Sequence, residues 1–257
     1  CFYCKVNFIV LLQARTNSSR LPGKVLMKIK NIPIVVLAHN RASNKGASVK
    51  VLTSDNAHDN QLASILKSHN IQFFRGDLDN PLKRFADSLA NENDAMIVVR
   101  LTADNVFPDG ELIHDVVENF CNRKVNYLLC NGPKSGFPHG VSIEVTRVKY
   151  IREAHLHSIK LHDKEHVTPF IRNEKINLKI GNLENTKDLS HIRITLDHKE
   201  DLELIKQIIS QINKNPILIN DIMKLLSRNP ELIKINQHIF SNEGMLKSLQ
   251  QDRNFKN

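Results

Sequence analysis

Short apolar runs rich in Val and Ile alternate along the chain with stretches in which apolar residues recur every three or four positions. The first pattern predicts buried strands and the second predicts amphipathic helices. The expected strands are VNFIVLL (6–12), VKVLTS (49–54), IQFFRG (71–76), AMIVVRL (95–101), VNYLLC (125–130), VSIEVT (141–146) and HIRITL (191–196). Strands that alternate with helices usually form a mainly parallel sheet covered on both faces, so we expect a three-layer α/β/α fold with a mainly parallel mixed sheet.

Three stripes of apolar residues at helical spacing predict helices that face the core. The stripes are Leu62, Ile65 and Leu66; Leu112, Ile113, Val116 and Val117; and Leu202, Ile205, Ile208, Ile209 and Ile212. Asp109 precedes the second stripe, where its carboxylate can accept hydrogen bonds from the free N–H groups of a first helical turn. We therefore expect Asp109 to cap that helix.

The composition changes after Pro216, where the chain becomes rich in Ile, Leu, Asn and Lys and has a helical pattern throughout. We expect a main domain over residues 1–216 and a helical C-terminal extension over residues 217–257. The apolar positions of the extension are Ile217, Leu218, Ile222, Leu225 and Leu226. Such a stripe can pack on the main domain of the same chain or against a second subunit.

A cationic loop, QARTNSSRLPGK (13–24), follows the first predicted strand directly. It carries Arg15, Arg20 and Lys24 together with a Pro-Gly turn. Loops of this kind hold phosphate, because backbone N–H groups and fixed positive charges converge on them. The loop lacks the Walker pattern and the chain has no G-x-G-x-x-G, which disfavours an ATPase or a dinucleotide-dependent dehydrogenase. A solvated surface loop with incidental cations is the alternative interpretation.

Two aspartates follow predicted strands, Asp104 in VVRLTADN and Asp197 in HIRITLDHKEDLEL. Ligands of α/β sheets bind at the carboxyl ends of strands. Two carboxylates there can hold Mg²⁺ or Mn²⁺ while water and phosphate complete the coordination shell. Separately, Asp197 could be a helix cap and Asp104 a loop cap. Together with the cationic loop, the two aspartates favour a site for a nucleoside triphosphate.

The charge of the chain is basic, with 36 Lys and Arg against 27 Asp and Glu and a net charge of +9. Such a charge attracts anions, including nucleic acids and phosphorylated metabolites. The cations are dispersed, Trp is absent and aromatic residues make up only 5% of the chain. Nucleic-acid binders usually combine clustered cations with exposed aromatic residues, so we expect a local anion site and no nucleic-acid partner.

The four cysteines have no second C-x-x-C pair after Cys1 and Cys4, and Cys121 and Cys130 lack zinc-ligand spacing. We interpret them as reduced thiols of a cytoplasmic protein. The apolar run at 6–12 is too short to span a membrane, so no membrane association is expected.

The loop ARTNSSRLPGK resembles the A-R-x-x-S-x-R-L-P-x-K signature of the sugar-acid cytidylyltransferases, which make CMP-activated sialic acids and related acids. More narrowly, the chain is similar to the branch associated with spore coat polysaccharide biosynthesis. The supporting blocks are RGDLDNPLKRF (75–85), RLTADN (100–105), FPHGVSIEV (137–145), EHVTPFIR (165–172) and NEGMLKSLQQD (242–252). The similarity extends from about residue 7 to residue 252, and the ordered combination is more specific than any single block.

The resemblance implies a glycosyltransferase-A-like nucleotide-binding fold over the main domain. It also implies a reaction in which a sugar-acid hydroxyl attacks the α-phosphorus of CTP and pyrophosphate leaves. The matching nucleotide-binding positions are Ala14, Arg15, Ser18, Arg20, Lys24, Arg84 and Thr102, and the metal positions are Asp104 and Asp197. Among them, Arg15, Lys24 and Asp104 are the expected catalytic residues.

The acceptor side departs from the family pattern, because His139 and Ser142 stand where relatives often carry acidic residues. The candidate acceptor contacts are His139, Ser142, Glu144, Glu165 and His166. The resemblance implies a homodimer that takes CTP and a sugar acid of the sialic, legionaminic or pseudaminic type. The alternatives are a glycosyltransferase or other nucleotidyltransferase of the same fold, or a non-catalytic nucleotide-binding descendant.

Overall fold

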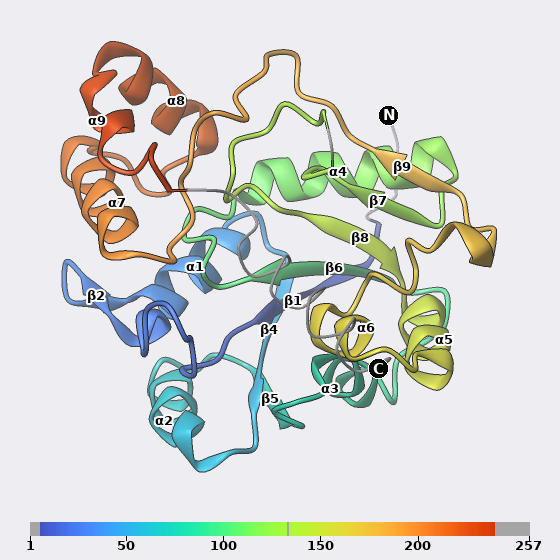
Figure 1. Cartoon of the computed structure of the whole chain (residues 1–257). Helices are drawn as coiled ribbons and strands as arrows, with labels where there is room; N and C mark the ends of the chain where they lie inside the picture. Colours follow the sequence, from blue (N-terminus) through green and yellow to red (C-terminus); the bar gives the residue numbers. More distant parts are fainter. Residues whose placement is uncertain (1–5, 133, 240–257) are drawn as a thin grey trace, which may run out of the picture.

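Seven strands form one twisted sheet in the computed structural model, which describes residues 6–132 and 134–239 (Figure 1). The strands are β1 Phe8–Gln13, β4 Ser48–Ser54, β5 Phe73–Gly76, β6 Ile97–Thr102, β7 Tyr127–Leu129, β8 Glu144–Arg147 and β9 Ile180–Asn182, in the spatial order β5-β4-β1-β6-β8-β7-β9. Only β8 opposes the common direction, since it is antiparallel to both β6 and β7. The predicted mainly parallel, mixed sheet is confirmed.

The prediction of a strand at HIRITL (191–196) is wrong. The segment makes a single isolated bridge, between Arg193 and His139, and its backbone bonds to loops. The N–H of Ile194 donates to the carbonyl of His139 at 2.7 Å, and the N–H of Leu196 donates to the carbonyl of Asp104 at 2.8 Å. Its Ile-rich alternation reflects burial between these loops. The seventh strand of the sheet is β9, which was not predicted. A small hairpin of β2 (Lys28–Ile29) and β3 (Ile32–Pro33) was not predicted either.

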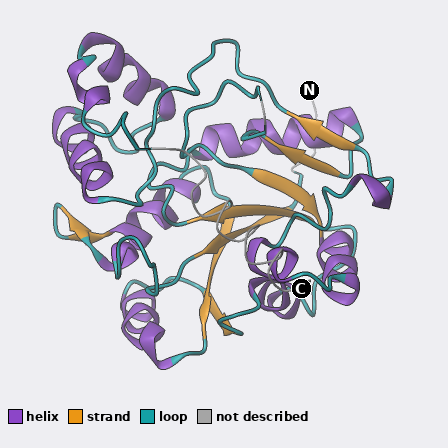
Figure 2. Cartoon of the chain, in the orientation of Figure 1, coloured by secondary structure: helices purple, strands orange, loops and turns teal. Residues whose placement is uncertain are grey.

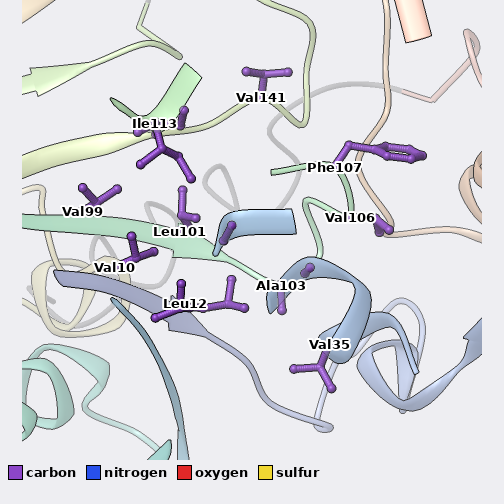
Figure 3. Packing of buried hydrophobic residues seen from close by; sticks show 14 of the residues in the cluster. Val10, Leu12, Val35, Val99, Leu101, Ala103, Val106, Phe107, Ile113 and Val141 are labelled. Carbon is purple, nitrogen blue, oxygen red and sulfur yellow. The ribbon is translucent and has the colours of Figure 1, made fainter. Parts of the chain in front are cut away.

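Helices cover both faces of the sheet, giving three layers (Figure 2). They are α1 Ile34–Ala42, α2 Asn60–Ser68, α3 Pro81–Ser88, α4 Gly110–Arg123, α5 Val148–His157, α6 Leu161–His166, α7 Lys199–Gln211, α8 Ile219–Arg228 and α9 Glu231–Lys234. Alternate residues of β1 are buried in two separate hydrophobic cores. Val10 and Leu12 pack with α1, α4 and α7, while Ile9 and Leu11 pack with α3 and α5. Figure 3 shows part of the first core.

The three predicted stripes lie on α2, α4 and α7 and face the first core. Asp109 caps α4 as predicted, since its Oδ1 accepts hydrogen bonds from the N–H groups of Glu111 at 2.9 Å and Leu112 at 3.2 Å. Its Oδ2 also accepts from the N–H of Ile219 at 2.9 Å. One buried carboxylate therefore joins the first turns of α4 and α8.

The extension after Pro216 packs within the chain wherever the structure describes it. Ile217, Ile222 and Leu226 are buried in the same core as β1 and β6, and Leu225 is partly buried against it. The block at 242–252 and the pair Cys1 and Cys4 lie outside the described residues. Among the described helices, none is long and apolar enough to cross a membrane.

Candidate active site

The loop at residues 13–24 is fixed to the sheet by a buried carboxylate from a distant segment. Asp59 is 1% exposed, and its Oδ1 accepts hydrogen bonds from the backbone N–H of Thr16 at 2.8 Å and from its hydroxyl at 2.7 Å. Oδ2 accepts from the N–H and hydroxyl of Ser54, at the end of β4. Burial alone would raise the pKa of Asp59, but the hydrogen bonds from Ser54 and Thr16 hold it below its usual value. Asp59 was missed at the sequence level, because nothing in a lone aspartate indicates a partner 43 residues away.

A tight turn at the end of the loop aims Lys24 into the site. The N–H of Gly23 donates to the carbonyl of Thr16 at 2.9 Å, and Gly23 has a φ of 69° in the left-handed region. Glycine adopts this conformation without strain. Lys24 then begins the short 3-10 helix Lys24–Leu26, and its side chain is only 8% exposed.

The ammonium group of Lys24 lies between two carboxylates. Its Nζ donates to Asp104 Oδ2 at 2.9 Å and to Asp197 Oδ1 at 2.8 Å. Burial alone would lower the pKa of Lys24, but the two carboxylates raise it above its usual value. For Asp104, the effect of burial is outweighed by Lys24 and by a hydrogen bond from Thr102, so its pKa is about 2. Three residues that were far apart in the sequence thus form one charged cluster at neutral pH.

Two arginines extend this cluster on the side of Asp197. Arg20 Nη2 donates to Asp197 Oδ1 at 2.8 Å, and Arg193 Nη2 lies 3.4 Å from Asp197 Oδ2. Arg193 is also held by Asp201, through Nε at 2.8 Å and Nη2 at 2.9 Å. Neither Arg193 nor Asp201 was predicted from the sequence. Their one available signal was the spacing within HIRITLDHKEDLEL, which places Asp201 four residues after Asp197.

Arg84 of α3 is a buried cation of a different kind. It is fully buried, and none of its three guanidinium nitrogens has a hydrogen-bond acceptor in the described part of the chain. Burial, and then the nearby Arg15, lower the pKa of Arg84 to about 10, while acidic residues such as Asp59 oppose this shift. The group is therefore still charged at neutral pH. A buried charge without a hydrogen-bond partner is energetically costly. A bound anion would accept hydrogen bonds from Arg84 that the described residues do not accept.

The other predicted nucleotide contacts lie along the same edge of the sheet. Ala14 is buried, and its N–H donates to the carbonyl of Leu52 at 2.9 Å. The Ser18 hydroxyl lies 3.4 Å from the N–H of Leu21, within the loop itself. Thr102 is the last residue of β6, immediately before the segment that carries Asp104.

Two predicted acceptor contacts lie on the segment that packs beside residues 191–196. Burial lowers the pKa of His139 below its usual value. The next residue is Gly140, with a φ of 108°, where a Cβ atom would come within 2.6 Å of the backbone nitrogen of Thr195. This close approach explains the glycine in FPHGVSIEV. The hydroxyl of Ser142 accepts a hydrogen bond from Asn131 Nδ2 at 2.7 Å.

The other acceptor candidates lie on the opposite face of the sheet, with α6. Glu144 of β8 is buried and paired with Arg100 of β6, whose Nη1 lies 3.0 Å from Oε1. Burial would raise the pKa of Glu144, but the positive charge of Arg100 lowers it. On α6, Glu165 Oε1 lies 3.8 Å from Arg15 Nη2, and burial lowers the pKa of His166 to about 4. The structure therefore divides the five candidates between two places.

The two aspartates fit a divalent cation, since a cationic group already lies between them at 2.9 Å and 2.8 Å. Their carboxylate oxygens are the donors that Mg²⁺ and Mn²⁺ prefer. Within residues 6–132 and 134–239, no cluster of three or more His, Cys, Asp or Glu side chains could hold a metal alone. A divalent ion here would thus need further oxygen ligands from phosphate or water.

A mainly parallel sheet with helices on both faces, a cation-bearing loop after β1 and carboxylates at the same edge define an α/β nucleotidyltransferase. Residues 9–232 match the family described as Cytidylyltransferase. The chain belongs to this family, and it is a cytidylyltransferase enzyme.

Known relatives and solved structures resemble nearly the whole chain. The structure of a cytidylyltransferase from Leptospira borgpetersenii has a TM-score of 0.83 and 26% identity, covering 91% of this chain and 99% of that one. The spore coat polysaccharide biosynthesis protein SpsF of Bacillus subtilis is 27% identical over 236 residues, 88% of this chain and 96% of its own. CMP:2-keto-3-deoxy-manno-octonic acid synthetase complexed with CTP shares the fold, with a TM-score of 0.60 and 15% identity, covering 80% of this chain and 99% of that one.

Proposed function

We propose that this cytidylyltransferase transfers CMP from CTP to a hydroxyl group of a sugar acid and releases pyrophosphate, for the synthesis of a surface glycan. The observation that carries the proposal is the contact of Lys24 with both Asp104 and Asp197, at the end of a cationic loop that Asp59 hydrogen-bonds through Thr16. This arrangement supplies cations for a triphosphate and carboxylates for its metal ion. The similarity to SpsF, a spore coat polysaccharide biosynthesis protein, supports the synthesis of a surface glycan. The shared fold of the synthetase complexed with CTP supports a sugar acid as the acceptor class.

In this proposal the loop binds the triphosphate through Ala14, Arg15, Ser18, Arg20 and Lys24. Arg20 and Lys24 are paired with Asp197 in the structure, so a bound triphosphate would compete with that carboxylate for them. Arg84 would approach the nucleotide from α3, and Thr102 would contact the nucleoside at the end of β6. The buried guanidinium of Arg84, which lacks an acceptor in the described residues, supports its role.

Asp104 and Asp197 would hold Mg²⁺ or Mn²⁺. When bound, the ion would neutralise charge on the phosphates and lower the pKa of the attacking hydroxyl. The attack at the α-phosphorus would put negative charge on the phosphoryl oxygens and the leaving group, and in this proposal Arg15 and Lys24 stabilise that charge. A covalent enzyme nucleophile is not needed.

The acceptor contacts in this proposal are His139 and Ser142 on one side, and Glu144, Glu165 and His166 on the other. With a pKa of about 4, His166 is neutral at pH 7 and can exchange hydrogen bonds with a sugar hydroxyl. We propose acids of the sialic, legionaminic or pseudaminic type. The net charge of +9 favours the approach of both anionic substrates.

We also propose that the enzyme acts as a cytoplasmic homodimer. The apolar residues of α8 are used in the core, so an interface would lie elsewhere. Leu156 and Ile159, which are 75% and 88% exposed, are apolar side chains that a second copy could cover. Light scattering would report the mass of the particle in solution, and a monomer at micromolar concentration would contradict the dimer.

Pyrophosphate release tests the proposed function. The assay supplies Mg²⁺, each of the four nucleoside triphosphates in turn, and sialic, legionaminic, pseudaminic and eight-carbon ulosonic acids. We expect release with CTP and one of these acids. Release with another nucleotide alone would overturn the cytosine assignment, and no release together with no Mg·CTP binding would overturn the proposal.

A further inference from the structure

Asp201 is completely buried and accepts more hydrogen bonds than a helix cap requires. Its Oδ2 accepts from the N–H of His198 at 2.9 Å, which is the usual contact of the third residue of α7 with the residue that caps the helix. The same oxygen accepts from the N–H of Asp197 at 2.8 Å. Both oxygens also hold the guanidinium of Arg193, at 2.8 Å and 2.9 Å. Asp201 therefore fixes Asp197 through its backbone and through the arginine beside its carboxylate.

Asn236 connects this network to the segment that follows α9. Its Nδ2 donates to Asp201 Oδ1 at 2.8 Å and to the carbonyl of Arg193 at 3.1 Å, and Asn236 is 1% exposed. The C-terminal helices thus contact the carboxylate cluster through one amide side chain.

A second helix offers a comparison within the same chain. Asp221 occupies the third position of α8, and its Oδ2 accepts from the N–H of Leu218 at 3.3 Å. Within the described part of the chain, its other oxygen contacts the exposed Lys214 alone, at 2.6 Å. Asp221 therefore has the same capping position as Asp201, but in the described residues it does not contact the site. The contacts of Asp201 with the N–H of Asp197 and with Arg193 thus go beyond what a helix cap needs.

We propose that Asp201 is a positioning residue that holds Asp197 in place for the divalent cation, with Arg193 as the linking group. This inference rests on the proposed function, because it takes Asp197 as a metal ligand. Without the Asp201 carboxylate, Arg193 keeps its charge and turns to its remaining carboxylate, that of Asp197, where it competes with the metal. Residues that orient metal ligands commonly change metal affinity by about 10-fold to 100-fold when they are altered.

The test is a titration with Mn²⁺ in the presence of saturating CTP and without acceptor, using the electron paramagnetic resonance signal of free Mn²⁺. Asp201→Asn can still accept the N–H of His198 through its one amide oxygen, but it is uncharged and its NH₂ group cannot accept from Arg193 Nε, so the two-oxygen ion pair with Arg193 is lost. We expect it to raise the Mn²⁺ dissociation constant about 10-fold or more. Asp221→Asn, the matched control, should leave the constant within about twofold of wild type, because the described contacts of Asp221 are with Leu218 and Lys214 and not with Asp197 or Arg193. The affinity for CTP without metal should be unchanged in both variants.

Equal Mn²⁺ constants in Asp201→Asn and Asp221→Asn would overturn the proposal. Asp197→Asn separates this failure from that of the proposed function, because an unchanged constant there would remove Asp197 as a metal ligand. If Asp201→Asn does not fold, Arg193→Lys serves instead, since lysine keeps the charge but cannot hold Asp201 through two nitrogens. We expect weaker Mn²⁺ binding in that variant as well, and an unchanged constant would contradict the positioning role.

Discussion

Lys24 and Arg84 are both buried cations, but they differ in their hydrogen-bond partners. Lys24 is paired with Asp104 and Asp197, and Arg20 and Arg193 also contact Asp197. Arg84 is more deeply buried, yet its guanidinium has no acceptor among the described residues. In the first region the cation is hydrogen-bonded to carboxylates, whereas the guanidinium of the second has acidic residues nearby but no hydrogen-bond acceptor among the described residues.

This difference indicates how each region meets an anionic ligand. In the proposed function, a triphosphate and its metal ion would replace existing ion pairs at the Lys24 cluster, where the charged groups are already held together before binding. At Arg84, an anion would instead add a hydrogen-bond partner that the described residues do not supply. Binding at Arg84 would then remove an energetic cost that the folded chain carries.

The largest expected effect is on turnover at the paired cluster. Lys24→Ala and Asp104→Asn should each lower kcat about 100-fold to 1,000-fold, because Lys24 is proposed to stabilise negative charge in the transition state and Asp104 is proposed to hold the metal ion that does the same. Steady-state pyrophosphate release would measure the loss, and thermal melting would show that both variants fold. Turnover above one tenth of wild type, roughly a loss of 1.4 kcal/mol or less, would contradict the catalytic roles.

At Arg84 we expect opposite effects on binding and on stability. Arg84→Met should weaken CTP binding about 10-fold to 150-fold, since a hydrogen bond from a charged group contributes about 1.5 to 3 kcal/mol. The free energy of unfolding of the nucleotide-free protein should stay the same or rise by about 1 kcal/mol, because an unpaired buried charge is replaced by an apolar chain. Calorimetric titration and urea unfolding measure the two quantities.

Arg41 is the matched control for this variant. It is also buried, and burial lowers its pKa to about 10, but its Nη1 donates to the carbonyl of Val106 at 2.9 Å and its guanidinium lies over the Phe107 ring. Arg41→Met should therefore destabilise the fold by about 1 to 3 kcal/mol and leave CTP affinity unchanged. If Arg84→Met destabilises the protein as Arg41→Met does, the contrast between paired and unpaired cations is refuted.

The smallest expected effect is a pH dependence of stability from Asp104. Its pKa of about 2 in the folded protein lies below the unfolded value of about 3.9. The carboxylate thus contributes stability that is fully present above about pH 5 and is lost as the pH falls toward 2. The difference in unfolding free energy between wild type and Asp104→Asn should shrink over this range. Urea unfolding at pH 5, 4 and 3 would show it, and a constant difference would mean that Lys24 does not hold the carboxylate ionised.

The sequence predicted those parts of the fold that depend on local pattern. The strands at β1, β4 and β6 and the stripes of α2, α4 and α7 follow from spacing alone, and Asp109 follows from its place before a helix. The segment 191–196 has the same Ile-rich alternation, but a strand also needs a neighbour with free hydrogen-bonding groups. Its backbone bonds to His139 and Asp104 instead. The alternation of hydrophobic residues indicates that a segment is buried, but it does not indicate which segment its backbone bonds to.

The same limit applies to the site. The cationic loop and the two aspartates could be selected by residue type and position, whereas Asp59, Arg193 and Asp201 act by contacts that close only in the folded chain. The lack of a hydrogen-bond acceptor for Arg84 among the described residues likewise depends on how the folded chain packs, so the sequence does not show it. A sequence reveals which groups can bind a ligand, and the structure reveals which groups hold them in place.

We propose that the chain transfers CMP, with the α-phosphorus of CTP, to a sugar acid. This transfer can be followed in one incubation with CTP labelled with ³²P at the α-phosphorus and a parallel one with the label at the γ-phosphorus, each with Mg²⁺ and the acceptor. We expect α-label in a new CMP-sugar acid and γ-label only in pyrophosphate. Transfer of γ-label to the sugar acid, or α-label only in free CMP, would contradict it.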